Sequence, residues 1–362
     1  MTRSFTFGGL PMRVLFGHGT LDQLSAEADL LGMRRVLVLS TPQQRDQAGQ
    51  AARLLGDRHA GNFDGAVMHT PTEVTERALE TVRAHAIDGV VAIGGGSTTG
   101  LGKAIALHTD LPQIVVPTTY AGSEMTPILG QTENGLKTTQ RDPRILPETT
   151  IYDVSLTLGL PVALSATSGL NAIAHAVEAL YAPDANPIVS LLSREAIGAL
   201  ARALPAVVDA PGDVEARADA LYGAWLCGVA LGAVGMGLHH KLCHTLGGSF
   251  DLPHAETHAV VLPHALAYNA PAAPEAARLV ADALGAADAA AGLHALALRL
   301  GAPISLAALG MREGDLDRAA DLACRAAYPN PRTLARDAIR ALLEDAFHGR
   351  APSGAPAREQ AR

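Results

Sequence analysis

Residues 89–97, GVVAIGGGS, decide the fold of this chain. Val90 to Ile93 form a continuous apolar run, which is typical of a strand buried on both faces of a parallel sheet. The glycines that follow end the strand, and the sequence after them predicts a helix through Leu107. A strand, a glycine turn and a helix in this order indicate an α/β domain.

The same alternation continues on both sides of this stretch. The predicted strands are Met12–Phe16, Val36–Leu39, Ala66–Met68, Gly89–Ile93, Gln113–Val116 and Thr149–Tyr152, with crossover helices at Gln43–Leu55 and Glu73–His85. Asn134-Gly135, at the centre of Thr132–Lys137, predicts a type I′ hairpin. We therefore expect residues 1–157 to form an α/β dinucleotide-binding domain with a Rossmann-like parallel sheet.

From Pro161 onward the composition changes to alanine and leucine without β-branched runs. The predicted helices are Ala163–Leu180, Pro187–Val208, Val214–Leu238, Glu256–Asn269, Pro274–Leu284, Ala287–Leu300, Glu313–Cys324 and Thr333–Phe347. We expect residues 158–348 to form an all-α domain. Residues 349–362 are rich in proline, alanine and glycine, which predicts a disordered tail.

Composition narrows the class of partner. The chain has 362 residues, of which 48% are hydrophobic, so two domains with sizeable cores are expected. The formal net charge of -8 argues against nucleic acid and anionic membranes, because both select basic surfaces. The uncharged run Ala220–Leu238 has Gly228 and Gly232 at GxxxG spacing, but its glycines dilute its hydrophobicity and basic flanks are missing. We therefore expect this run to form a buried core helix. The acidic charge of the chain favours a small molecule as its ligand.

The cysteines indicate a reducing compartment. Cys227, Cys243 and Cys324 form no CxxC pair and are odd in number, which disfavours a disulfide framework. The first residues, MTRSFTFGGLPMRVLF, contain no apolar region followed by a small-residue cleavage site, so we expect no secretory signal and a cytoplasmic location.

Backbone and hydroxyl groups at strand ends predict a cofactor site. The glycine turn consists of Gly94, Gly95, Gly96 and Ser97, whose N–H groups could face a pyrophosphate with a helix dipole behind them. A plain tight turn is the alternative, because the motif is not G-x-G-x-x-G. Thr118 and Thr119 end the next strand and offer hydroxyls to the same crevice, which favours the cofactor interpretation.

Ser40 and Thr41 follow the Val36–Leu39 strand, where a dinucleotide fold often has an acidic residue for the ribose diol. That acid is absent, and Arg45 lies nearby in the sequence. We therefore expect NADH as the cofactor with NADPH accepted beside it, an ordinary loop being the alternative.

The stretch His239–His264, HHKLCHTLGGSFDLPHAETHAVVLPH, is the densest in chemistry. His240 and His244 share a helix face, and His254 follows beyond a Gly-Gly loop and a proline. A second i, i+4 pair, Asn171 and His175, lies upstream. Together they predict one site that closes around a metal or a substrate, and separate structural histidines are the alternative.

Several motifs in order resemble the iron-containing alcohol dehydrogenase superfamily, and most closely its maleylacetate reductases. They are GGGS at Gly94, PTTYAGSEMTPI at Pro117, RDPRILPETTIYD at Arg141, SGLNAIAHAVEALYA at Ser168, HHKLCHTLGG at His239, LPHAETHAVVLPH at Leu252 and YPNPR at Tyr328. The resemblance covers nearly the whole chain. It implies the dehydroquinate synthase-like, iron-containing alcohol dehydrogenase architecture, often found as a homodimer.

The resemblance also implies a metal site that this chain has altered. Iron or zinc in the superfamily is held by an Asp and three histidines, which correspond here to Asn171, His175, His240 and His254. Asparagine removes the anionic ligand, so we expect metal binding to be weakened or absent. Gly100 occupies a second position where many members have Asp, which favours a less negative site and a dianionic substrate.

The resemblance implies NAD(P)H-dependent reduction of maleylacetate to 3-oxoadipate in the degradation of aromatic compounds. Protonated histidines among His175, His240 and His254, with Asn171, would stabilise the enolate oxygen. His244 would deliver the proton, and Lys137 would hold a substrate carboxylate. The alternative is an alcohol or polyol dehydrogenase that depends on iron or zinc.

Overall fold

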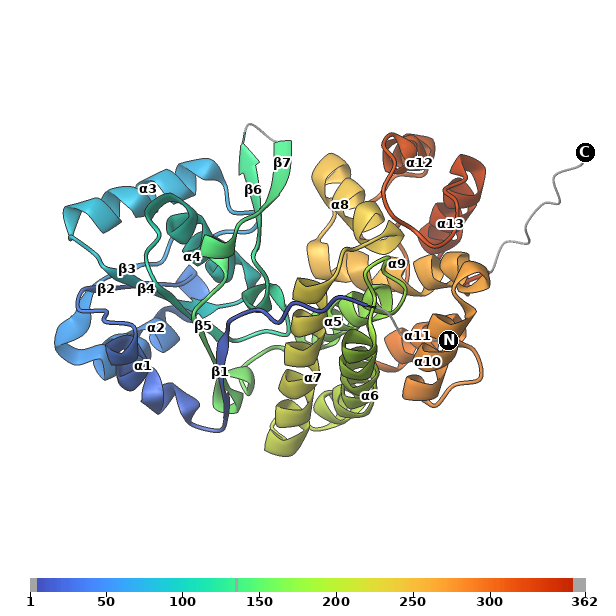
Figure 1. Cartoon of the computed structure of the whole chain (residues 1–362). Coiled ribbons are helices and arrows are strands. Elements are labelled where there is room, and N and C mark those ends of the chain that lie inside the picture. The colour runs from blue at the N-terminus through green and yellow to red at the C-terminus, as the bar shows by residue number, and fades with distance from the viewer. Residues whose placement is uncertain (1–4, 134–135, 354–362) are drawn as a thin grey trace, which may run out of the picture. The chain divides into compact units, whose positions relative to one another are not determined.

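The computed structural model describes residues 5–133 and 136–353. The described chain divides into two compact units. The sheet unit comprises residues 8–161 and 210–233, and the helical unit comprises residues 5–7, 162–209 and 234–353. Figure 1 shows the elements of both units, coloured along the chain.

A six-stranded parallel sheet forms the centre of the sheet unit, with the strand order β1-β8-β5-β4-β2-β3. Its strands are β1 (Arg13–Gly17), β2 (Val36–Leu39), β3 (His59–Phe63), β4 (Gly89–Gly94), β5 (Gln113–Pro117) and β8 (Thr149–Asp153). Its helices are α1 (Leu24–Leu30), α2 (Arg45–Leu55), α3 (Thr72–Ala84), α4 (Gly96–Thr109) and α7 (Val214–Ala233). Short 3₁₀ turns lie at Thr20–Gln23, Pro42–Gln44, Gly56–Arg58, Ser123–Met125, Pro143–Ile145 and Val154–Thr157.

Successive residues of the central strands face opposite sides of the sheet, and both sides are buried. Val36, Val38, Val91 and Ile93 lie in one core cluster with Leu24 and Ala48 from α1 and α2. The intervening residues, Leu37, Leu39, Val90 and Ala92, lie in a second cluster with Ala78 of α3 and Leu101 of α4. Because a strand has a period of two, helices on both faces require a continuous apolar run, which β2 and β4 provide.

The strand prediction holds in the centre of the sheet and fails at its edge. The strand predicted at Ala66–Met68 is wrong, because this segment is a loop in which Met68 is exposed. The strand β3 instead lies at His59–Phe63 and pairs only with β2. An edge strand is covered less completely than a central one, so its sequence, HAGNF, carries little apolar signal. The short helix α1 was also not predicted.

An antiparallel hairpin accompanies the main sheet. It consists of β6 (Ile128–Glu133) and β7 (Leu136–Arg141), which confirms the predicted hairpin pairing. The predicted type I′ turn at Asn134-Gly135 lies outside the described residues.

The helix α7 belongs to the sheet unit, whereas the predicted boundary placed it in the helical domain. Its two spaced glycines explain the close packing. A Cβ on Gly228 would lie 2.9 Å from the backbone of Gly122, and one on Gly232 would lie 2.4 Å from the carbonyl oxygen of Met125. The guanidinium of Arg141 also donates to the carbonyl of Gly232 at 2.8 Å. The GxxxG spacing therefore serves packing against the loop that follows β5.

Eight α-helices make up the described part of the helical unit. They are α5 (Val162–Leu180), α6 (Pro187–Asp209), α8 (Leu238–Phe250), α9 (His254–Asn269), α10 (Pro274–Leu284), α11 (Ala289–Arg299), α12 (Leu316–Cys324) and α13 (Arg336–His348), with 3₁₀ turns at Ala270–Ala272 and Glu313–Asp315. A parallel sheet followed by helices confirms the predicted fold class.

Two local predictions in the helical half are wrong. One helix was predicted for Val214–Leu238, but α7 ends at Ala233 and α8 begins at Leu238. The Gly-Gly loop predicted before His254 is also wrong, because Gly247 and Gly248 lie inside α8. That helix ends at Phe250, its C-cap Asp251 adopts the left-handed conformation (φ 55°), and His254 then begins α9. Tertiary packing of α8 outweighs the low helix propensity of two glycines.

One described segment, Pro274–Arg299, is long and apolar enough to cross a membrane by length and composition. It is divided into α10 and α11, and Gly285 between them is left-handed (φ 64°). Helices α7 and α8 pass the same test only if they are taken together.

The predicted disordered tail, residues 349–362, is described only as far as Ser353. The hydroxyl of Ser353 and the backbone N–H of Arg350 both donate to Asp345 in α13. Residues 354–362 lie outside the described part of the chain.

Candidate active site

The predicted cofactor residues of the sheet unit meet at one edge of the sheet. The strands β2, β4 and β5 are neighbours, so their carboxyl ends lie side by side. The N–H of Thr118 donates to the carbonyl of Gly94 at 2.9 Å, and a Cβ on Gly95 would lie 3.1 Å from the side chain of Thr119. The two segments predicted from sequence are therefore in direct contact.

The first turn of α4 supplies the anion-binding groups of this edge. Its N-cap is Gly95, and Gly96 and Ser97 are its first residues. Gly94 has a φ of 151°, and a Cβ there would lie 2.5 Å from the hydroxyl of Thr98. Glycine allows the backbone to pass this close, and the open N–H groups of a helix start favour a phosphate.

The loop after β2 reaches the same edge through Gln44. The side chain of Gln44 contacts the hydroxyl of Thr41 at 2.6 Å and that of Thr118 at 3.4 Å. Ser40 is buried, and its backbone pairs with Phe63 at the end of β3. Arg45 forms an ion pair with Asp64, the residue that follows β3. The carboxylate near this loop is therefore that of Asp64, which comes from the segment after β3 and not from the segment directly after β2.

Lys103 holds the loop that follows β5 through hydrogen bonds. Its buried Nζ donates at 2.9 Å to both Thr126 Oγ1 and the carbonyl of Ile128, and it also contacts Ser123. Burial lowers its pKa to about 7, partly offset by the charge of Glu124. The sequence signal for this residue is a lysine inside an otherwise apolar helix.

Gly100 has a steric explanation in this unit. A Cβ at this position would lie 2.4 Å from Oγ1 of Thr70, so the threonine fills the space that a longer side chain would need. Thr70 is itself buried and has a positive φ of 46°.

The histidine site of the helical unit is built by α5, α8 and α9. Asn171 and His175 lie on α5, His240 and His244 on α8, and His254 at the first turn of α9. The rings of His175 and His240 are stacked with centroids 5.1 Å apart. The His244 ring lies 6.1 Å from that of His240. The predicted helical pairs are thus brought together around His240.

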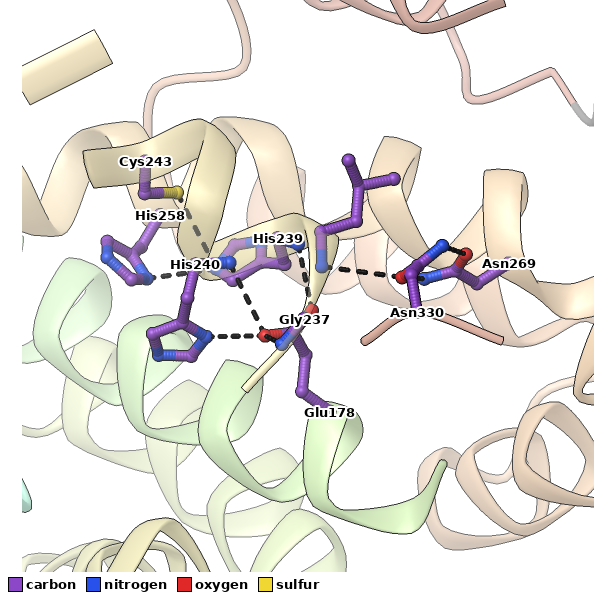
Figure 2. Close-up of polar contacts among 9 residues, drawn as sticks. Glu178, Gly237, His239, His240, Cys243, His258, Asn269 and Asn330 are labelled. Atoms are coloured by element: carbon purple, nitrogen blue, oxygen red, sulfur yellow. Dashed lines mark hydrogen bonds and ion pairs between the residues drawn. The ribbon is translucent and has the colours of Figure 1, made fainter. Parts of the chain in front are cut away.

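Glu178 is a site residue that the sequence analysis missed. Its carboxylate lies one turn beyond His175 and accepts the Nδ1 proton of His240 at 2.7 Å. It also accepts the backbone N–H groups of Gly237, His239 and His240 at 2.9, 2.8 and 3.3 Å (Figure 2). An anion at a helix start satisfies N–H groups that lack intrahelical partners. The spacing His175-x-x-Glu178 was the available signal.

This carboxylate determines which nitrogen of His240 faces the site. Because Nδ1 is held by Glu178, the free atom of the ring is Nε2, which is buried and has no hydrogen-bond partner among the described residues. Asn171 Oδ1 and His175 Nδ1 are also buried and also have no hydrogen-bond partner among the described residues. Each such atom costs about 1–3 kcal/mol unless a ligand satisfies it, so this group is prepared for a polar ligand.

A pair of asparagines fixes the same helix start from the other side. Asn330, from the YPNPR motif, exchanges amide hydrogen bonds with Asn269 at 2.8 and 3.0 Å and accepts the N–H of Leu238 (Figure 2). A Cβ on Gly237 would lie 3.2 Å from Glu178 Oε1 and 3.3 Å from Asn330 Oδ1. A side chain at this position would press on both groups that hold α8.

His239 and His258 lie immediately behind His240. Nε2 of His239 and Nδ1 of His258 are 2.9 Å apart, and the sulfur of Cys243 is 3.7 Å from the same Nε2 (Figure 2). The ring of His258 also lies 4.4 Å from that of His254 and 5.1 Å from that of His240. The cluster is therefore larger than the predicted set.

Burial keeps several of these rings neutral. It lowers the pKa of His175, His239 and His258 well below the usual range, and the neighbouring imidazoles add to the effect. Protonation of His175 in the folded protein would therefore carry a desolvation cost. Neutral His175 can still donate one N–H.

Two other predicted site residues, His244 and His254, do not share the burial of His175 and His240. His244 is exposed, and His254 is partly exposed. Lys137 lies in β7 opposite Thr132, but its side chain lies outside the described part of the structure. Arg332, from the YPNPR motif, donates to the carbonyl of Tyr268 and stacks on its ring.

The four positions that the resemblance assigns to iron do not fit that metal well. They offer an amide and three imidazoles, with no anionic ligand. Glu178, the nearest carboxylate, is engaged with His240 and the start of α8. Non-haem iron(II) is typically held by a carboxylate beside imidazoles, and these four positions supply no carboxylate.

Two family models match the chain. The model for iron-containing alcohol dehydrogenase matches residues 11–154, and that for the C-terminal part of the Fe-containing alcohol dehydrogenase family matches residues 165–347. Both units are therefore matched.

Curated relatives and solved structures match over nearly the full length. Maleylacetate reductase from Rhizobium sp. (strain MTP-10005) is 59% identical over 96% of this chain and 99% of its own. The crystal structure of maleylacetate reductase from Agrobacterium tumefaciens matches with a TM-score of 0.94 at 59% identity, over 97% of this chain and 100% of that one. An iron-containing alcohol dehydrogenase from Corynebacterium glutamicum matches with a TM-score of 0.92 at 43% identity, over 98% and 99%.

Proposed function

Because the chain belongs to the iron-containing alcohol dehydrogenase family, we propose that it acts as a maleylacetate reductase, an NAD(P)H-dependent oxidoreductase. The observation that carries the proposal is the 59% identity to a curated maleylacetate reductase over nearly the whole chain. The neutral donor set around Asn171 supports it against a metal-dependent alcohol dehydrogenase.

The reaction converts maleylacetate, NADH and a proton into 3-oxoadipate and NAD⁺. Hydride adds to the alkene carbon β to the ketone, and the electron pair of the C=C bond moves to form an enolate whose negative charge lies on the ketone oxygen. A proton then adds to the α carbon. The protein must hold the dicarboxylate, direct N–H donors at the developing oxyanion and deliver this proton.

The unpartnered buried atoms are the proposed substrate contacts. The amide of Asn171 and the N–H of neutral His175 would donate to the ketone oxygen as it gains charge. When Nε2 of His240 also carries a proton, this atom donates to the same oxygen while Glu178 balances the positive charge of the ring. His254 would complete the set.

His244 is proposed to deliver the proton to the α carbon. It is exposed and lies one helical turn after His240, with ring centroids 6.1 Å apart. Exposure allows it to regain a proton from solvent after each turnover. Lys137 is proposed to pair with a substrate carboxylate.

The edge formed by β2, β4 and β5 is the proposed cofactor site. The first turn of α4, at Gly95, Gly96 and Ser97, would bind the pyrophosphate, with Gly94 permitting close approach. Thr118 and Thr119 would contact the same ligand, and the loop at Ser40 and Thr41 would lie near the ribose. NADH is the proposed donor, with NADPH also accepted.

We further propose that the enzyme is a cytoplasmic homodimer that takes part in the degradation of aromatic compounds, without a nucleic-acid or membrane partner. The acidic balance of the chain, with a net charge of -8, supports the last point.

Deuterium transfer tests the proposal directly. With NADH carrying deuterium at the transferred position, the label should appear in 3-oxoadipate at the carbon β to the ketone. A secondary alcohol carrying deuterium on the former ketone carbon would refute the proposal, because carbonyl reduction is the chemistry of an alcohol dehydrogenase. The label should stay at the carbon β to the ketone after exhaustive chelation, and a loss of turnover that iron alone restores would support the metal-dependent alternative.

A further inference from the structure

A buried cluster of His239, Cys243 and His258 lies outside the residues used in the proposed reaction. Their ligand atoms lie within 4.8 Å of one another, and each of the three side chains is buried. His239 and Cys243 are one turn apart on α8, and His258 comes from α9 (Figure 2). Two imidazoles and a thiol that converge from two rigid helices form a typical zinc-binding set.

We propose that His239, Cys243 and His258 bind a divalent cation of borderline softness, of which zinc is the best match, at a site separate from the Asn171 and His240 positions.

The distances support this assignment. In a tetrahedral site with bonds of about 2.05 Å to nitrogen and 2.3 Å to sulfur, ligand nitrogens lie about 3.3 Å apart and nitrogen and sulfur about 3.5 Å apart. The corresponding separations here are 2.9 Å between the two imidazole nitrogens and 3.7 Å between nitrogen and sulfur. These two sides differ from the ideal values by a few tenths of an ångström, and the third side, between the sulfur of Cys243 and a ring nitrogen of His258, is no longer than 4.8 Å.

The charges also favour a cation. Cys243 would supply the anionic ligand that the family's own metal positions lack in this chain. Burial raises the pKa of its thiol well above the usual range, so the thiol is protonated without a metal and loses its proton when one binds. A dication with one thiolate leaves a single positive charge, and the buried carboxylate of Glu178 lies nearby on the backbone N–H of His239.

The site would connect α8 to α9 directly behind His240. The imidazole atoms facing the cation would be Nε2 of His239 and Nδ1 of His258, so each neutral ring would carry its single proton on the outer nitrogen, and the one proton that now lies between the two rings would move. Water would fill the fourth position. The cation would thereby hold the backbone that carries His240 without contacting the substrate.

Cobalt spectroscopy tests this site without any assay of turnover. The full-length chain, stripped of metal by a chelator, would be titrated with Co²⁺ and its absorbance recorded. One equivalent should produce the near-ultraviolet charge-transfer band of a cobalt–thiolate bond, and zinc should abolish it by competition. Cobalt that binds without this band, or no bound cobalt at micromolar concentration, would overturn the proposal.

Matched variants assign the band. Cys243→Ser should lose it, whereas Cys324→Ser, at a partly exposed cysteine elsewhere, should keep it. A band that persists in Cys243→Ser refutes the assignment. The wild-type spectrum decides the question even if Cys243→Ser does not fold. Because maleylacetate is absent, failure here leaves the proposed reaction intact, and failure of the reaction leaves this site intact.

Discussion

The Glu178→Gln variant tests how the start of α8 controls the site. Oε2 of Glu178 accepts the N–H of Gly237 and two protons from His240, whereas Oε1 accepts the N–H of His239. Glutamine retains the shape but replaces one oxygen by an NH₂ group. In its better orientation the NH₂ faces the N–H of His239, which leaves that donor unsatisfied at a cost of about 1–3 kcal/mol.

The remaining hydrogen bonds also weaken, because each loses its charged acceptor. Hydrogen bonds to charged groups contribute about 1.5–3 kcal/mol, against about 0.5–1.5 for neutral pairs. We therefore expect Glu178→Gln to destabilise the protein by about 3 kcal/mol in total. The ring of His240 also loses its orientation, so kcat/KM for maleylacetate should fall by about 10–100-fold, as for other partners that orient a histidine.

The assay combines a thermal melt with NADH-dependent turnover. The matched control is Glu27→Gln in the sheet unit, since Glu27 is also buried and accepts hydrogen bonds from Arg13 and Thr149. The control should lower the melting temperature without a specific loss of kcat/KM. If Glu178→Gln is destabilised like the control but keeps its kcat/KM, the positioning role of Glu178 is wrong.

Three further changes give distinct outcomes. Asn171→Asp should raise the iron or zinc content measured by elemental analysis, because it restores an anionic ligand; an unchanged content would show that the amide is not what excludes the cation. Gly100→Asp should lower the melting temperature by the equivalent of about 2 kcal/mol, because Thr70 occupies the space, and an unchanged value would contradict the geometry. Burial lowers the pKa of His264 to about 4, against an ordinary value near 6.5, so the unfolded chain binds this proton first and stability should be lost as pH falls from about 6.5 to about 4. His264→Gln should flatten this part of the profile, and an unchanged slope would refute the assignment.

The centre of the sheet was predictable because its signal is local. The runs at Val36–Leu39 and Gly89–Ile93 are apolar throughout, which only strands covered on both faces require. The edge strand β3 was not predictable, because it has one neighbour and little apolar content. The break between α7 and α8 was missed for a different reason, since Gly235 and Gly237 at the break do not stand out in the sequence from Gly228 and Gly232, which lie inside α7.

The candidate site also has features that the sequence shows and features that only tertiary contacts decide. The helical spacing of Asn171 with His175 and of His240 with His244 was visible in the sequence, because residues four apart share one helix face. Glu178 was missed, since its role depends on where α5 meets the start of α8. Thr119 was expected to reach the crevice at the glycine turn because it ends the next strand along the chain, and its contact with Gly95 follows from the structure, in which these two strands are neighbours.

The sequence by itself determined the order of elements, the fold class and the helix faces that carry the chemistry, because periodicity and glycine punctuation act over a few residues. Only the tertiary structure decided that Glu178 holds Nδ1 of His240, that α7 packs in the sheet unit, and that His239, Cys243 and His258 converge. Those contacts join residues far apart in the chain, and their geometry follows from how whole helices pack, which local patterns do not encode.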